Sequence, residues 1–93
     1  MPRIPRHLEL EVLLGLLKEV RDNVPQAAVA HAMGWKQTDV SKVERGARRI
    51  EALELRAWIH ALGWPFEDVM RELDERLMAV EHLQEQAGGR KRL

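Results

Sequence analysis

The segment from residue 26 to residue 46 constrains the fold of this 93-residue chain more than any other stretch. Its apolar residues recur at helical spacing on the facing sides of two short helices. They are Val29, Met33, Val40 and Val43. Ala30 is small where the helices must approach closely, and Gly34 can adopt the positive φ angle of a tight turn. The pattern predicts helices over residues 26–33 and 37–45 that pack across a turn.

The same segment resembles the family of lambda-repressor and Cro-like regulators of the xenobiotic-response-element type. The resemblance covers residues 24–63 and rests on Gln26, Ala30, Gly34, Val40, Val43, Glu44-Arg45-Gly46 and Ala61-Leu62-Gly63. It implies a helix-turn-helix whose second helix, residues 37–45, enters the major groove of DNA. Lys36 and Glu51 depart from the family, which usually has capping hydroxyl residues there.

Hydrophobic periodicity predicts an all-α fold, a compact five-helix domain with an extended C-terminal helix. The helices are expected over residues 7–21, 26–33, 37–45, 51–62 and 65–86. Asn23 is expected to hold the left-handed backbone conformation that ends the first helix. The fourth helix should bury Leu55, Trp58, Ile59 and Leu62, while Trp64 should fill the corner before the fifth helix.

These elements divide the chain into four parts. Residues 1–6 are predicted to form a flexible arm, and residues 7–64 the DNA-binding domain. Residues 65–87 should form a C-terminal helix that packs on the core and forms a dimer interface. Residues 88–93 should form a disordered basic tail.

The composition excludes several classes of protein. Without cysteine the chain has no disulfide framework and no thiolate metal site. The longest apolar stretch, residues 12–17, is far shorter than the ~20 residues of a membrane span. No apolar run of a signal peptide follows the basic N-terminus. We therefore expect a cytoplasmic protein.

The net charge is zero, but its distribution is uneven. Residues 23–50 carry five basic residues against two acidic ones, whereas residues 51–87 carry three basic residues against nine acidic ones. A DNA duplex responds to the local field and not to the total charge. The basic segment is therefore expected to face DNA and the acidic half to face away.

The predicted helix over residues 37–45 carries an unusual set of polar side chains. Thr38 and Ser41 are the only hydroxyl side chains of a chain without tyrosine. We assign base reading to Lys36, Gln37, Thr38, Ser41 and Lys42, because such side chains can bond to base edges. A lysine at a helix start opposes the helix dipole, at a cost of about 0.3–1 kcal/mol, which favours a role in contacting DNA. The alternative is an ordinary solvated helix face.

Four further residues are assigned to phosphate contact: Gln26, Arg45, Arg48 and Arg49. Gln26 opens the second helix, where free N–H groups can hold a phosphate, and the resemblance implies the same role for its amide. The three arginines flank the end of the recognition helix. The alternatives are a simple helix-start residue and plain solvated charges.

Catalytic and metal chemistry find no support in the sequence. The four histidines, His7, His31, His60 and His82, are scattered over four predicted helices without ligand spacing. No histidine lies near Thr38 or Ser41 to activate a hydroxyl nucleophile. We expect no enzymatic activity, no metal and no cofactor.

The predicted fifth helix carries an apolar stripe with a seven-residue repeat. We assign Leu73, Leu77, Val80 and Leu83 to a homodimer interface. The alternative is that this helix folds back on the first helix.

We therefore expect a sequence-specific transcriptional regulator, a small dimeric repressor that reads a palindromic operator in double-stranded DNA. The alternative, from another class, is an antitoxin-type or adaptor protein that holds a protein partner on its acidic C-terminal helices.

Overall fold

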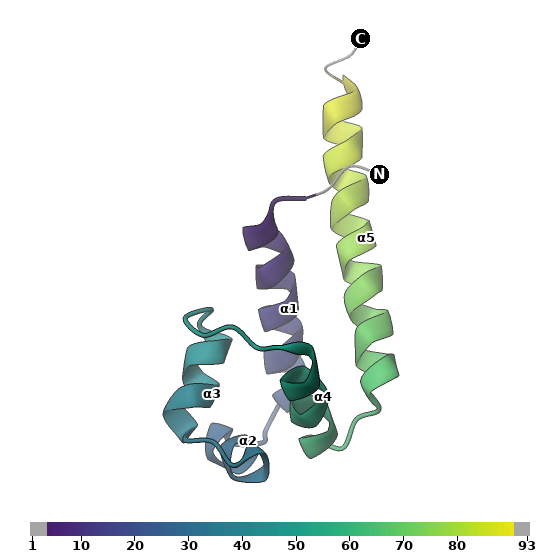
Figure 1. Cartoon of the computed structure of the whole chain (residues 1–93). Coiled ribbons are helices and arrows are strands. Elements are labelled where there is room, and N and C mark those ends of the chain that lie inside the picture. Colours follow the sequence, from purple (N-terminus) through teal and green to yellow (C-terminus); the bar gives the residue numbers. More distant parts are fainter. Residues whose placement is uncertain (1–3, 91–93) are drawn as a thin grey trace.

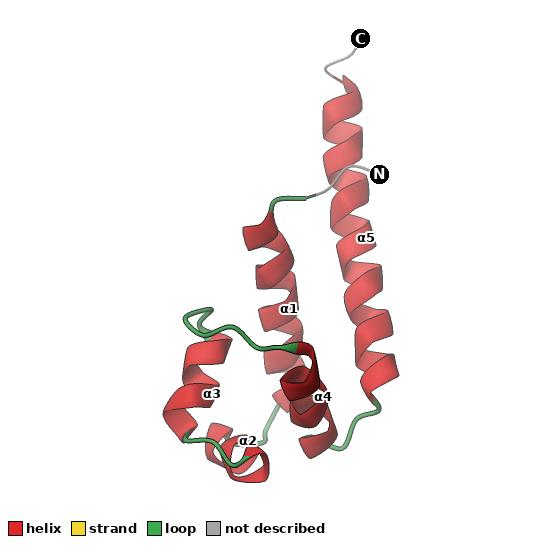
Figure 2. Cartoon of the chain, viewed as in Figure 1, coloured by secondary structure: helices red, strands yellow, loops and turns green. Residues whose placement is uncertain are grey.

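All regular structure in the computed structural model is helical over the described residues, which are 4–90 for the backbone and 4–86 for the side chains. The helices are α1 (Arg6–Arg21), α2 (Gln26–Met33), α3 (Gln37–Glu44), α4 (Ala52–Ala61) and α5 (Phe66–Arg90) (Figures 1 and 2). The prediction of an all-α chain with five helices is therefore confirmed. Within these residues no helix is long and apolar enough to cross a membrane.

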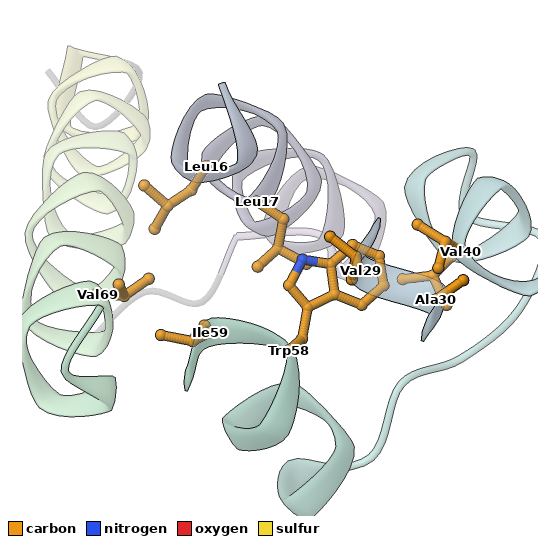
Figure 3. Packing of buried hydrophobic residues seen from close by; sticks show 9 residues of the cluster. Leu16, Leu17, Val29, Ala30, Val40, Trp58, Ile59 and Val69 are labelled. Atoms are coloured by element: carbon orange, nitrogen blue, oxygen red, sulfur yellow. The ribbon is translucent and has the colours of Figure 1, made fainter. Parts of the chain in front are cut away.

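The helices surround one core. α2 packs against α3 and α4, while α1 contacts α3 and α5. α1 and α5 lie side by side and run in opposite directions, and the C-terminal part of α5 continues beyond the N-terminal end of α1 (Figure 1). All five helices contribute buried side chains, namely Leu16, Leu17, Val29, Ala30, Val40, Val43, Trp58, Ile59 and Val69 (Figure 3). Of the predicted facing residues of the two short helices, Val29, Val40 and Val43 therefore lie in the core, and Met33 is half-buried against it.

Gly34 ends α2 in the left-handed conformation predicted for it, with φ 69°. The N–H of Trp35 donates to the carbonyl of Ala30 at 2.8 Å, which satisfies one of the last carbonyls of α2. At the end of α1 the prediction was wrong, because Asp22 and not Asn23 has positive φ, 48°. Its ψ of −117° lies outside the left-handed helical region, and its N–H donates to the carbonyl of Lys18 at 3.0 Å.

Glu51 caps α4 although it is not a hydroxyl residue. Its carboxylate accepts from the N–H of Glu54 at 3.0 Å, and the Glu54 carboxylate accepts from the N–H of Glu51 at 3.1 Å. This reciprocal pair does the work of a capping box. Trp64, expected to fill the corner before α5, is instead half exposed.

Both predicted ends of the domain need correction. Ile4, placed in the flexible arm, is only 2% exposed, and α1 already begins at Arg6. At the other end α5 continues through Gly88 and Gly89 to Arg90, because glycine costs a helix only about 1 kcal/mol and no proline stops it. The remainder of the predicted arm and tail, residues 1–3 and 91–93, lies outside the described residues.

Candidate nucleic-acid interface

The five residues assigned to base reading lie together on the outer side of α3 and at its start. Lys36, Gln37, Thr38 and Lys42 are exposed and Ser41 is half-buried, whereas Val40 and Val43 on the opposite side are fully buried. We call the set Lys36, Gln37, Thr38, Ser41 and Lys42 the α3 face. Helical periodicity explains this separation, because the two valines anchor α3 in the core.

The start of α3 is capped without use of the Lys36 side chain. An ammonium group cannot accept a hydrogen bond, and the Asp39 carboxylate instead accepts from the Lys36 backbone N–H at 3.1 Å. Asp39 also places a negative charge at the positive end of the helix dipole. Among the described residues no salt bridge engages the Lys36 ammonium, which stays exposed beside the α3 face.

A buried carboxylate fixes α3 to the two helices before it. Glu44 is 4% exposed, and its oxygens accept from Arg21 Nε at 2.6 Å and Arg21 Nη2 at 3.0 Å. Gln26 Nε2 donates to the same carboxylate at 2.8 Å. Residues from α1, α2 and α3 therefore meet at one charge whose acceptors are satisfied, as burial requires.

Gln26 extends this network to the α3 face. While its Nε2 is held by Glu44, its Oε1 accepts from Gln37 Nε2 at 3.5 Å. Both ends of the Gln26 amide are therefore engaged within the protein. The structure thus gives this amide a positioning role towards Gln37, which the phosphate assignment did not include. No local sequence pattern reveals it, because the partners lie 18 and 11 residues away.

Arg48 is held in internal contacts, in contrast to the other two assigned arginines. Its guanidinium lies 3.9 Å from the centre of the Trp35 ring and pairs with Glu54 at 3.4 Å. Trp35 in turn meets the buried Trp58 edge-on. Arg48 therefore joins the turn before α3 to α4, and these contacts engage the guanidinium group that was assigned to phosphate. Arg45 and Arg49 are exposed.

The residues assigned to a dimer interface are largely covered within the chain. Leu73 packs against the core, and Leu77 shares a cavity with Leu10 and Leu13 of α1. Val80 is half-buried, and only Leu83 of the set is mostly exposed, at 64%. At Leu73 and Leu77 α5 therefore folds back on α1, which was the alternative to a dimer interface.

No group of three or more His, Cys, Asp or Glu side chains that could hold a metal occurs in the part of the chain that the structure describes. Comparison of the chain with protein-family models, with curated proteins and with solved structures found no match.

Proposed function

We propose that the protein is a sequence-specific regulator that binds double-stranded DNA, with α2, its turn and α3 acting as a helix-turn-helix of the lambda-repressor type. The observation that carries this proposal is the α3 face. It is a row of polar and basic side chains, exposed on a helix whose other side is anchored by Val40 and Val43. α3 enters the major groove, where such side chains meet base edges.

Among the residues of the α3 face, Gln37 has the side chain that the structure preorganises for base contact. Gln26 orients its amide, and Glu44 orients Gln26. An amide held in this way can pair with adenine through both its donor and its acceptor, at little entropic cost. Lys36 and Lys42 suit guanine, and the methyl group of Thr38 suits thymine.

Arg45 and Arg49 supply phosphate contacts on this proposal, together with the N–H groups at the start of α2. Arg48 is left out of this set because Trp35 and Glu54 hold it. A small homodimer reading a palindromic operator is the form we propose, since one recognition helix covers only a few base pairs.

Selection of duplexes from a random library, followed by fluorescence anisotropy on the selected and a scrambled duplex, tests the proposal. Gln37→Ala should weaken the binding of the selected duplex by about 1–3 kcal/mol and relax the base preference at one base pair per half-site. Arg49→Gln should lower the affinity for both duplexes alike. It should also flatten the dependence of log affinity on log salt concentration by about one unit of slope. Gln84→Ala, an exposed glutamine on α5, is the matched control and should change neither.

Equal losses on both duplexes for Gln37→Ala would remove base reading from the α3 face. Failure of the wild type to select any duplex would favour the second candidate, an antitoxin-type or adaptor protein. The observation behind that candidate is the acidic surface of α5, on which Glu67, Asp74 and Glu85 are exposed. Such a surface suits a basic protein partner.

A further inference from the structure

We infer that a cavity between α1 and the α3–α4 loop, residues 45–51, binds a small carboxylate that carries an apolar chain. Its volume is about 230 Å³. Leucines of α1 form one wall, and Val43, Gly46 and Ile50 form the other. Three arginines, Arg6, Arg48 and Arg49, complete the lining. None of them belongs to the α3 face.

The apolar part of the cavity sets the size of the ligand. The volume is large enough for an alkyl chain of several carbon atoms. The loop is in contact with α1 at one edge, because a Cβ at Gly46 would lie 3.4 Å from Leu14 Cδ1 and 3.7 Å from Leu10 Cδ2. Leu10 itself is 42% exposed, so a chain can enter beside it.

The charge of the lining sets the head group. Three arginines and no acidic residue line the cavity among the described residues. Arg48 is held by Trp35 and Glu54, so Arg6 and Arg49, which are both exposed, are the guanidinium groups that can meet a ligand. Guanidinium groups bind carboxylates through parallel N–H bonds. A medium-chain carboxylate therefore matches both parts of the lining.

Occupancy of this cavity would also affect DNA binding, and this consequence rests on the proposed function. Arg49 lines the cavity and is a proposed phosphate contact. A bound carboxylate would neutralise the charge that Arg49 offers to the duplex, so the ligand should lower DNA affinity.

Isothermal titration calorimetry of the full chain with octanoate tests the binding without DNA. We expect a Kd below about 1 mM, which a ligand of this size can reach. Acetate lacks the chain and octanol lacks the charge, so both should bind at least about tenfold more weakly. Octanol binding as well as octanoate, or no binding of octanoate, would overturn the proposal.

Variants locate the site. Leu10→Trp should fill the cavity and weaken the binding of octanoate about tenfold or more. Leu53→Trp, the same change at an exposed leucine of α4, should leave the binding of octanoate unchanged. Arg6→Gln should weaken binding about threefold, against no change for Arg56→Gln, an exposed arginine outside the lining. An unaltered Kd in both Leu10→Trp and Arg6→Gln would sink the site.

Leu10 and Arg6 also line the cavity between α1 and α5, so amide NMR shifts decide between the two. Octanoate should move the signals of Gly46 and Ile50. Shifts confined to Leu73 and Leu77 would overturn the assignment. In the DNA assay octanoate should lower the affinity of the wild type and of Leu53→Trp for the selected duplex. It should leave the affinity of Leu10→Trp unchanged. If no duplex binds at all, the proposed function is wrong. The calorimetry still tests the octanoate site in that case, because it is done without DNA.

Discussion

Glu44 is a buried charge that holds α1, α2 and α3 together through Arg21 and Gln26. Glu44→Ala should lower the free energy of unfolding by about 3 kcal/mol, because it leaves the Arg21 guanidinium, 21% exposed, without its partner. Urea denaturation measures this loss. Glu85→Ala, at an exposed position, should stay within about 0.5 kcal/mol of the wild type.

A double replacement sharpens that prediction. Arg21→Met with Glu44→Met removes both charges, so it should recover most of the stability that Glu44→Ala loses. A double variant as unstable as Glu44→Ala would show that the loss comes from packing and not from an unpaired charge.

Two glycines should respond in opposite directions to the same substitution. Gly34 has φ 69°, and a Cβ added there would meet no atom within 4 Å, so Gly34→Ala should cost about 1 kcal/mol through backbone strain alone. Gly15 lies within α1, and a Cβ added there would also meet no atom within 4 Å. Gly15→Ala should therefore raise the free energy of unfolding by about 0.5–1 kcal/mol. Thermal melting of both variants checks this, and equal shifts in one direction would contradict it.

Residue by residue, the sequence predicts what depends on local spacing. Gly34, Val40 and Val43 could be placed because a turn and a helix face are local properties. The partners of Glu44 and of Arg48 could not, because they lie on other helices whose relative positions depend on the whole core.

At the scale of elements, the helices themselves follow from hydrophobic periodicity, but their ends do not. The first helix starts at Arg6 because Pro5 precedes it and its carbonyl accepts from Leu8 and Glu9, at 3.0 and 3.2 Å. The burial of Ile4 arises from tertiary packing, which no periodicity of so short a segment could reveal.

The contact between α1 and α5 should depend on pH through Glu19. The Arg76 guanidinium donates to both Glu19 oxygens, at 2.7 and 3.0 Å, and this lowers the pKa of the Glu19 carboxyl below its ordinary 4.5. A lowered pKa in the folded state stabilises the fold above the unfolded pKa, and this stabilisation disappears as the pH falls through the folded value. It is therefore complete at neutral pH and is lost only below about 4.5.

NMR titration of the Glu19 carboxyl carbon measures this effect. Arg76→Gln should return the pKa of Glu19 to its ordinary value. Arg71→Gln, which removes an arginine paired with Asp68 on the same helix, should leave it lowered. An unchanged pKa in Arg76→Gln would show that Arg76 does not hold Glu19 in solution.

The whole molecule is elongated because of α5. Its radius of gyration is 15.3 Å, against about 12 Å for a compact domain of this length. The long axis measures 54 Å and the others 25 and 23 Å. α5 has 25 residues and therefore spans about 37 Å, more than the core beside it can cover. Its C-terminal part extends away from α2 and α3 (Figure 1).

This shape explains why the sequence could not decide between a dimer stripe and an internal contact. Leu73 and Leu83 belong to one apolar stripe along α5, yet Leu73 packs on the core and Leu83 is exposed. Periodicity identifies the face of a helix, whereas the length of the neighbouring helix decides how much of that face is covered. α1, with 16 residues, is too short to cover α5.

The last prediction follows from the exposed end of α5. If the protein is a homodimer, its interface lies around Leu83 and the adjoining half-buried Val80, because Leu73 and Leu77 are covered within the chain. Leu83→Asp should then convert the dimer to a monomer in sedimentation equilibrium at tens of micromolar. Met78→Asp is the matched control. It is 52% exposed but lies roughly 140° around the same helix, so the dimer should persist.

A two-fold dimer also constrains the operator. Its half-sites should be related by inversion and separated by about one helical turn, ~10 bp or 34–36 Å, and Leu83→Asp should bind them without cooperativity. A wild type that sediments as a monomer would remove the dimer from the proposal and leave each chain to read a single half-site. A Leu83→Asp variant that stays dimeric would instead place the interface elsewhere on the molecule.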